Sequence, residues 1–309
     1  MAQYPVIGFI GVGHMGHGMA KNILAGGYEL LVKGHRNRAP VEDLVALGAT
    51  ENDSPAGMAR ACDIIHLCLS NSPQVEAVIR GPGGILEGAH DGLVVVDCTT
   101  SDPASTVALA GELAAAGATL VDAPLGRTPK EAEAGTLDAM VGAEPEMFER
   151  LLPVIRCWAG NINRTGPVGS AHRMKLITNF ISLGYAALYS EALTLAVKSD
   201  LSPQSVRDVL AGSRMGCGFF DTFMAYAVGR DPEAHKFTLA NAAKDVGYVA
   251  SMAAEGQVMN LMGAAIRQYY THVSAKGAGA EYVPMLSDHV AALNGVDLAA
   301  SVAAGEKED

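Results

Sequence analysis

Hydrophobic residues in the first half of the chain form short unbroken runs that alternate with helical patterns. The runs are rich in β-branched residues and lack alternation with polar residues, which is typical of strands buried on both faces of a parallel sheet. Helical patterns such as residues 14–25 and 103–116 separate the runs. This βαβ rhythm predicts an α/β fold with a doubly wound parallel Rossmann sheet. The expected strands are residues 6–12, 30–34, 63–69, 93–99, 119–125 and 137–143.

The rhythm changes after about residue 166, where glycine and proline interrupt the pattern. Residues 170–198 are typical of one long apolar helix, and no strand pattern follows it. We therefore expect a dinucleotide-binding Rossmann domain over residues 1–167 and an all-helical domain for substrate binding and oligomerisation over residues 168–309. A helix this apolar is not expected to face water, which predicts a homodimer or homotetramer. The later expected helices are residues 202–211, about 218–228, 238–254, 259–275 and 282–293.

Composition narrows the class of protein. The net charge of −11 and the absence of a basic stripe argue against nucleic-acid binding. The N-terminal apolar run is short and interrupted by glycine, unlike a signal peptide, and no window reaches the ~20 apolar residues of a membrane helix. The five cysteines are scattered and odd in number, which favours reduced thiols in a cytoplasmic protein.

A glycine-rich loop, GVGHMG, follows the first expected strand and opens a helix. In this context each glycine has a separate requirement: Gly11 forms the tight turn, Gly13 admits the pyrophosphate, and Gly16 allows the helix to pack on the strand. The helix N-terminus adds N–H groups and a positive dipole end for the phosphates. The loop therefore predicts a nicotinamide dinucleotide cofactor, bound by Gly11, Val12, Gly13, His14, Met15 and Gly16.

The end of the second strand indicates which dinucleotide is bound. An acidic residue there would bind the ribose 2′-hydroxyl of NAD, but the segment 32–40 contains none. Arg36, Asn37 and Arg38 are instead placed to contact a 2′-phosphate, which favours NADP. The alternative is that these arginines are solvated charges and that NAD binds without its usual acid. We expect no metal site, because the loop that carries His14 and His17 is committed to phosphate and the other histidines are dispersed.

The long helix carries a second set of polar residues. Lys175, Asn179 and Ser182 are spaced i, i+4, i+7 and so lie on one helix face. Loss of hydration would lower the pKa of Lys175 and make it a proton donor near neutral pH. The alternative is that its ammonium reaches solvent and that Asn179 is a satisfied core amide. Lys244 and Asp245 are adjacent, so we expect them to point apart, and the pattern alone favours a solvated Lys244.

These segments resemble the β-hydroxyacid dehydrogenases, the group that includes 3-hydroxyisobutyrate dehydrogenase, and the resemblance runs nearly end to end. Residues 7–24 are similar to the family's cofactor signature. Residues 69–75 resemble its Leu-Pro-Asn loop, with Ser70 in place of proline, and residues 97–103 resemble its Asp-x-Ser-Thr loop, with Thr99 in place of serine. The resemblance implies cofactor contacts from Leu69, Ser70, Asn71 and Thr99, and a substrate contact from Thr100.

The resemblance also assigns roles in the helical half. Residues 169–180 resemble the family's Lys-x-x-Asn-Asn helix, which implies that Lys175 is the catalytic lysine and Asn179 its partner. Thr178 replaces the first asparagine and, with Ser182, is implied to line the substrate site. Residues 242–250 resemble the family's Lys-Asp-Leu element, which implies that Lys244 is an active-site contact on the cofactor side.

Residues 122–137 depart from the usual family pattern. Most members have Asp-Ala-Pro-Val-Ser-Gly-Gly here, whose last three residues hold the substrate carboxylate, but this chain has Gly126, Arg127 and Thr128. This turn resembles that of the 3-sulfolactaldehyde reductases in the family. A guanidinium adds a positive charge and several donors to an otherwise neutral anion site. We therefore expect these three residues to bind a sulfonate or carboxylate; the alternative is an internal ion pair with Glu131 or Glu133.

The resemblance implies a reversible hydride transfer between NADP(H), or NAD(H), and a short anionic 3-hydroxy acid or semialdehyde, an oxidoreductase acting on CH–OH groups. Lys175 would act as the general acid and base. Two alternatives share the architecture: an imine reductase and a non-catalytic dinucleotide-binding module. Both classes generally lack the helix lysine, so Lys175 argues against them.

Overall fold

The computed structural model describes residues 4–305 and divides the chain into two compact units, Met1–Lys175 and Leu176–Asp309. The boundary expected after residue 167 lies just before helix α8 (Ser170–Lys198), whereas the division between the units falls inside that helix. The start of α8 therefore packs as part of the first unit.

The first unit is built on a nine-stranded sheet with the order β3-β2-β1-β4-β5-β6-β8-β7, and β9 pairs with β8. Strands β3 to β6 in that order are parallel, as predicted for the sheet, although the short strand β3 was not among the expected strands. In parallel strands the carboxyl ends meet at one edge, where ligands bind in doubly wound folds. The strands are β1 (Ile7–Ile10), β2 (Leu30–Lys33), β3 (Thr50–Glu51), β4 (Ile64–Leu67), β5 (Val94–Asp97), β6 (Thr119–Asp122), β7 (Leu125–Gly126), β8 (Leu137–Gly142) and β9 (Ala159–Gly166).

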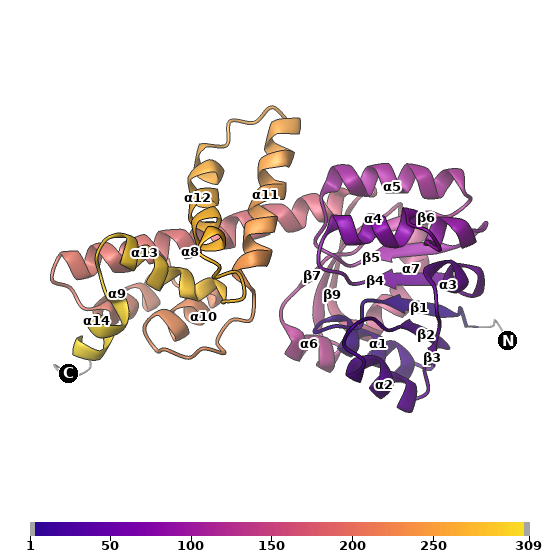
Figure 1. Ribbon diagram of the computed structural model, residues 1–309, viewed down its shortest axis with the longest axis horizontal. Coiled ribbons are helices and arrows are strands. Elements are labelled where there is room, and N and C mark those ends of the chain that lie inside the picture. The colour runs from indigo at the N-terminus through magenta and orange to yellow at the C-terminus, as the bar shows by residue number, and fades with distance from the viewer. Residues whose placement is uncertain (1–3, 306–309) are drawn as a thin grey trace. The chain divides into compact units, whose positions relative to one another are not determined.

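Helices cover both faces of this sheet (Figure 1). Side chains of β1 alternate between two cores: Ile7 and Phe9 pack with α1, α2 and α7, and Ile10 packs with α3, α4 and α5. Burial on both faces explains why the strands lack a polar alternation. The elements are α1 (Gly16–Ala25), α2 (Ala39–Ala46), α3 (Pro55–Ala61), α4 (Ser72–Arg80), η1 (Ile85–Gly88), α5 (Pro103–Ala115), α6 (Pro129–Ala134) and α7 (Pro145–Trp158).

The far edge of the sheet differs from the sequence prediction. Residues 137–142 form a strand, but β8 runs antiparallel to both β6 and β7. The connection from β6 to β8 holds a tight turn, β7 and the short helix α6, so the chain returns without a full crossover helix on one face. The unpredicted β9 extends the edge, and its exposed polar residues hide it from a search for apolar runs.

In the second unit the regular elements of the described residues are helices, apart from one isolated bridge between Thr238 and Tyr282, in agreement with the predicted all-helical domain. Its core gathers large side chains of four helices, such as Leu183, Phe220, Val246 and Tyr270. The elements after α8 are α9 (Pro203–Ala211), α10 (Gly218–Ala227), α11 (Leu239–Glu255), α12 (Leu261–Ala275), η2 (Val283–Met285), α13 (Leu286–Leu293) and α14 (Leu298–Gly305).

The prediction that no segment reaches the apolar content of a membrane helix needs correction. Helix α8 contains an 18-residue window with a mean hydropathy of 1.4, enough by length and composition for a membrane span. The window contains at most two charged residues. However, 44% of that window is buried inside the structure, and core helices of other proteins reach the same values.

Candidate active site

The glycine loop has the geometry that a dinucleotide cradle needs. Gly11 has φ +101°, and a Cβ there would lie 2.2 Å from the carbonyl oxygen of Cys68. A Cβ on Gly16 would lie 2.0 Å from the carbonyl oxygen of Gly11, so the helix start could not pack as closely. At Gly13 a Cβ would meet no atom within 4 Å, which leaves the backbone open to a ligand. The residues present therefore fit a pyrophosphate group.

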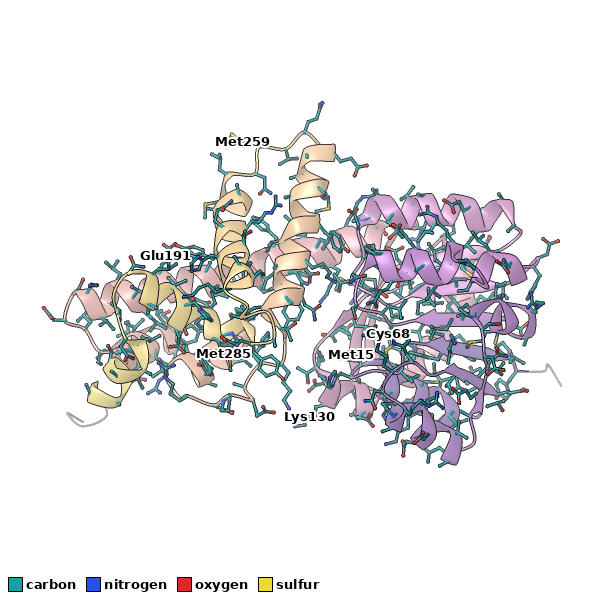
Figure 2. All side chains as sticks on the ribbon, viewed as in Figure 1. Met15, Cys68, Lys130, Glu191, Met259 and Met285 are labelled. Atoms are coloured by element: carbon teal, nitrogen blue, oxygen red, sulfur yellow. The ribbon has the colours of Figure 1, made fainter. Side chains whose placement is uncertain are left out.

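The rest of the loop leaves this cradle accessible. Helix α1 has no acidic residue in its first turn and no side-chain cap at Met15, so its positive end is not neutralised locally. Val12 is buried and His14 is exposed. Met15 and Cys68 both pack against the hydrophobic core at the edge where β1 and β4 end (Figure 2). This is the edge at which the parallel strands predict a ligand.

His17 is held by carboxylates rather than by a metal-ligand set. Its Nδ1 lies 2.7 Å from Glu133 Oε1 and its Nε2 lies 2.8 Å from Asp43 Oδ2. Burial alone would lower the pKa of His17, but these two hydrogen bonds outweigh it and the pKa is raised. Residues 4–305 contain no cluster of three or more His, Cys, Asp and Glu side chains that could hold a metal ion.

The segment predicted to bind a 2′-phosphate is only partly available. Arg36 is exposed, but Asn37 Oδ1 accepts a hydrogen bond from the N–H of Ala39. Arg38 donates to both carboxylate oxygens of Glu51, with Nη1–Oε1 and Nη2–Oε2 distances of 2.7 Å. The sequence argument missed Glu51, because the acid comes from β3 rather than from the segment itself. The feature that identifies Glu51 is the register of β3 on β2, which places Glu51 opposite Val32.

Two loops predicted to contact the nicotinamide are tied together at the ends of β4 and β5. The N–H of Leu69 donates to the hydroxyl of Thr99 over 3.0 Å, and the Thr99 N–H donates to Asp97. Asn71 caps α4 by accepting from the N–H of Gln74. Thr99 is buried, so its hydroxyl holds the loop. Ser70 is exposed on the loop after β4, and Thr100 is half-buried on the loop after β5.

The turn at residues 126–128 is strained at its arginine. Arg127 has φ +77°, a left-handed conformation that costs a residue with a Cβ about 1–2 kcal/mol. Its Nε lies 3.0 Å from Asp138 Oδ2, and its side chain stays 51% exposed. The partners proposed from the sequence, Glu131 and Glu133, are not the ones found. Asp138 is brought there by the antiparallel register of β7 on β8, opposite Gly126.

Thr128 is engaged within its own helix. Its N–H and its hydroxyl both donate to Oε2 of Glu131, over 3.1 Å and 2.5 Å, in a capping box that begins α6. These hydrogen bonds lower the pKa of Glu131, with the side-chain bond as the largest cause. Thr128 is exposed, but its N–H and hydroxyl already bond Glu131, so its contact with a substrate stays a prediction.

The first turn of α8 is anchored by buried acids. Asp122 accepts hydrogen bonds from the N–H groups of Gly169 and His172 over 2.7 Å and 2.8 Å, so a carboxylate meets the positive end of the helix. The His172 ring bonds to the Thr106 hydroxyl, and its Nε2 lies 3.9 Å from Asp97. Burial raises the pKa of Asp97 in spite of its hydrogen bonds and of nearby His172. Lys175, half-buried, follows His172 by one turn.

A second polar group lies in the helical unit. Asn179 donates through Nδ2 to Asp245 Oδ2 over 2.6 Å, and Lys244 Nζ lies 3.1 Å from Asp245 Oδ1. The expectation that Lys244 and Asp245 point apart is therefore wrong, because the long lysine side chain reaches back to its neighbour. Asp245 is 1% exposed and was missed by the sequence argument, although it follows a predicted site residue.

The remaining predicted residues of α8 lie on one unbroken helix. Because α8 is helical from Ser170 to Lys198, the spacing of Lys175, Asn179 and Ser182 keeps them on one face, as predicted. The Ser182 hydroxyl donates to the carbonyl oxygen of Asn179, and Thr178 is exposed. This face of the helix therefore carries the amine of Lys175, the buried amide of Asn179 and the hydroxyl of Ser182.

Comparison with known proteins identifies the family. Residues 6–166 match the family described as the NAD-binding domain of 6-phosphogluconate dehydrogenase, and residues 169–293 match the NAD-binding region of NADP-dependent 3-hydroxyisobutyrate dehydrogenase. The chain is 33% identical to 3-sulfolactaldehyde reductase of Escherichia coli over 273 residues, which cover 88% of this chain and 91% of the relative. It is 34% identical to 2-(hydroxymethyl)glutarate dehydrogenase of Eubacterium barkeri over 280 residues, 89% and 91% of the two chains.

A solved structure agrees with the fold. 3-Hydroxyisobutyrate dehydrogenase of Mycobacterium tuberculosis superimposes with a TM-score of 0.84 at 23% identity, over 93% of this chain and 99% of that one. With the matched families covering both units and two relatives above 30% identity, the chain belongs to the β-hydroxyacid dehydrogenase family of NAD(P)-dependent oxidoreductases.

Proposed function

We propose that the protein interconverts a short anionic 3-hydroxy acid and its semialdehyde, with Arg127 binding the acid group and Lys175 moving the proton. One observation carries this proposal: a half-exposed arginine is kept in a strained left-handed conformation on the turn that the family resemblance implies for substrate binding. The names of two relatives, 3-sulfolactaldehyde reductase and 2-(hydroxymethyl)glutarate dehydrogenase, denote enzymes acting on small anionic substrates.

The chemistry divides between the cofactor and the chain. A bound nicotinamide supplies or accepts the hydride. The ammonium of Lys175 donates a proton to the substrate carbonyl oxygen during reduction, and its amine takes that proton back during oxidation. The positive charge of Lys175 also stabilises the negative charge that develops on this oxygen. Asn179, fixed by Asp245, is a positioning group on the same helix face. The buried Asp122 fixes the start of α8 and thereby the backbone from which the Lys175 side chain extends.

Replacing Arg127 with glycine is expected to raise KM for an anionic semialdehyde by about 10- to 100-fold, the loss of one charge-assisted contact. Glycine is chosen because it adopts φ +77° without strain, so the turn keeps its shape. Steady-state kinetics with an anionic semialdehyde and a neutral aldehyde of equal length measure the effect. KM for the neutral aldehyde should change by less than about twofold.

An equal rise of KM for both aldehydes would show that Arg127 supports the fold of the turn through Asp138 and does not read charge. Arg127→Lys serves as a matched variant, since it keeps the charge but not the planar fork. Its KM should lie between those of the wild type and the glycine variant.

For the cofactor we propose NADP(H), with Arg36 as the exposed cation for the 2′-phosphate and NAD(H) as the weaker ligand. Arg38 contributes less than its sequence position suggests, because Glu51 already binds it. We place the protein in the cytoplasm, in line with its five free cysteines.

We further propose that α8 pairs with a second copy of the chain. Its exposed apolar residues recur at helical spacing and form a stripe, in which Leu188 and Leu195 are 52% and 68% exposed. The stripe comprises Ile177, Ile181, Tyr185, Leu188 and Leu195.

If α8 pairs with a second copy, light scattering should give the mass of two or four chains. Leu188→Glu should reduce this mass, whereas Val209→Glu on α9 should not; a monomeric wild type would contradict the pairing.

A further inference from the structure

The end of β2 contains an ion pair where Rossmann proteins that bind NAD have an acidic side chain. Gly34 is the first residue after β2, close to the ~20-residue spacing at which that acid follows the glycine loop. Because Gly34 has no side chain, the space beside its Cα is filled from elsewhere. A Cβ built on Gly34 would lie 2.2 Å from Nη1 of Arg38 and 2.8 Å from Oε1 of Glu51.

The pair is bidentate and fixed. Both terminal nitrogens of Arg38 donate to the two oxygens of Glu51 over 2.7 Å, the fork geometry that gives the strongest guanidinium–carboxylate contact. The side chains are 47% and 33% exposed, so a ligand at this strand end can reach them. Glu42 also approaches Arg38, but only to 3.8 Å from Nε, and it is more exposed.

The charges of this pair oppose each other for a phosphate ligand. A 2′-phosphate carries nearly two negative charges and is attracted by Arg38, but the carboxylate of Glu51 neutralises that guanidinium and repels the phosphate. A 2′-hydroxyl carries no charge, so the same carboxylate does not repel it and can accept its hydrogen bond.

We propose that Glu51 is a specificity-determining residue for the cofactor: it holds Arg38 against Gly34, competes with the 2′-phosphate for the guanidinium, and so narrows the preference for NADP(H) over NAD(H). The inference rests on the proposed function only in taking the end of β2 as the ribose site. Arg36 remains outside the pair, so the wild type still binds NADP(H). Its affinity for NADP(H) exceeds its affinity for NAD(H) by less than the basic segment 36–38 alone would suggest.

The test is direct cofactor binding without substrate. Glu51→Gln keeps the shape of the side chain and removes its charge. Its Kd for NADP⁺ by calorimetry should fall about tenfold, or ~1.4 kcal/mol, while its Kd for NAD⁺ should stay the same or rise. Glu42→Gln is the matched control and should change Kd for NADP⁺ by less than about twofold, because Glu42 does not occupy the terminal nitrogens. An unchanged or raised Kd for NADP⁺ in Glu51→Gln would overturn the proposal.

The double variant Arg38→Gln with Glu51→Gln separates competition for Arg38 from a general change of charge. The proposal requires that the gain in NADP⁺ affinity disappear in the double variant; a gain that persists would contradict it. Thermal melting of each variant establishes that it folds. These measurements do not depend on turnover. If the proposed role of Lys175 or the proposed substrate proved wrong, the binding results would therefore still test the role of Glu51.

Discussion

Replacing Lys175 with alanine is expected to lower kcat by about 10³-fold while cofactor binding is retained. A positioned proton donor contributes about 10²–10⁴-fold to a rate, and in the proposed mechanism Lys175 supplies both the proton and a positive charge near the reacting oxygen. The glycine loop predicted to bind the dinucleotide connects β1 to α1, so removing the amine of Lys175 should not alter that loop. Steady-state kinetics give kcat, and titration with NADPH gives the cofactor Kd.

Arg173→Ala is a matched control, because it removes a cation two residues earlier on an exposed position of the same helix. It should keep kcat within about threefold of the wild type. Near-normal kcat in Lys175→Ala would remove the lysine from the mechanism. Equal losses of kcat in both variants would show that activity depends on the general positive charge or on the folding of α8, and not on the amine of Lys175 in particular.

The second large effect concerns acid stability and His66. This residue lies on β4 with no exposed surface, stacked on Phe9 at a centroid distance of 5.6 Å and edge-on to Trp158 at 6.1 Å. Among the described residues, neither ring nitrogen has a hydrogen-bond partner. Burial without a partner penalises the charged imidazolium and lowers the pKa of His66 to about 3.

Because the pKa of His66 is lower in the folded protein than in the unfolded chain, the unfolded chain binds the proton more strongly than the folded protein does. The contribution of His66 to the free energy of unfolding is therefore lost as pH falls from its unfolded pKa of 6.5 toward about 3. At ~1.36 kcal/mol per pKa unit, the loss is about 2 kcal/mol at pH 5 and roughly 4 kcal/mol at pH 3.

His66→Leu should remove this loss. Between pH 7 and pH 5, its free energy of unfolding should fall by about 2 kcal/mol less than that of the wild type. Urea titrations followed by the fluorescence of Trp158 report this, because it is the chain's single tryptophan and lies in the same core. Identical pH dependence in the two proteins would mean that His66 has a partner that stabilises its charge.

The fold was predictable where one local property determines an element. The runs at β1, β4 and β5 are continuous because both faces of the sheet are covered, and α8 was predicted with its observed bounds because no glycine pair or proline interrupts it. β9 was not predictable from apolar runs, since its side chains are largely exposed and polar. The antiparallel direction of β8 depends on the returning turn and not on its own residues.

The candidate site shows the same division. The requirements on Gly11, Gly13 and Gly16 come from backbone space within the loop, so the sequence predicts them. The partners of Arg38 and Arg127 come from neighbouring strands: Glu51 lies on β3, 13 residues after Arg38, and Asp138 lies on β8, which follows α6. Sequence spacing therefore identified the cations but not the acids that modulate them.

The proposed reaction is hydride transfer to the carbonyl of a short acid, with Arg127 binding the acid group. The most direct measurement compares initial rates of NADPH oxidation with anionic semialdehydes (carboxylate and sulfonate), neutral aldehydes of matched length and cyclic imines. The account predicts that kcat/KM for at least one anionic semialdehyde exceeds that for the matched neutral aldehyde by about 100-fold or more. Equal values for the two aldehydes, or reduction of cyclic imines alone, would contradict it.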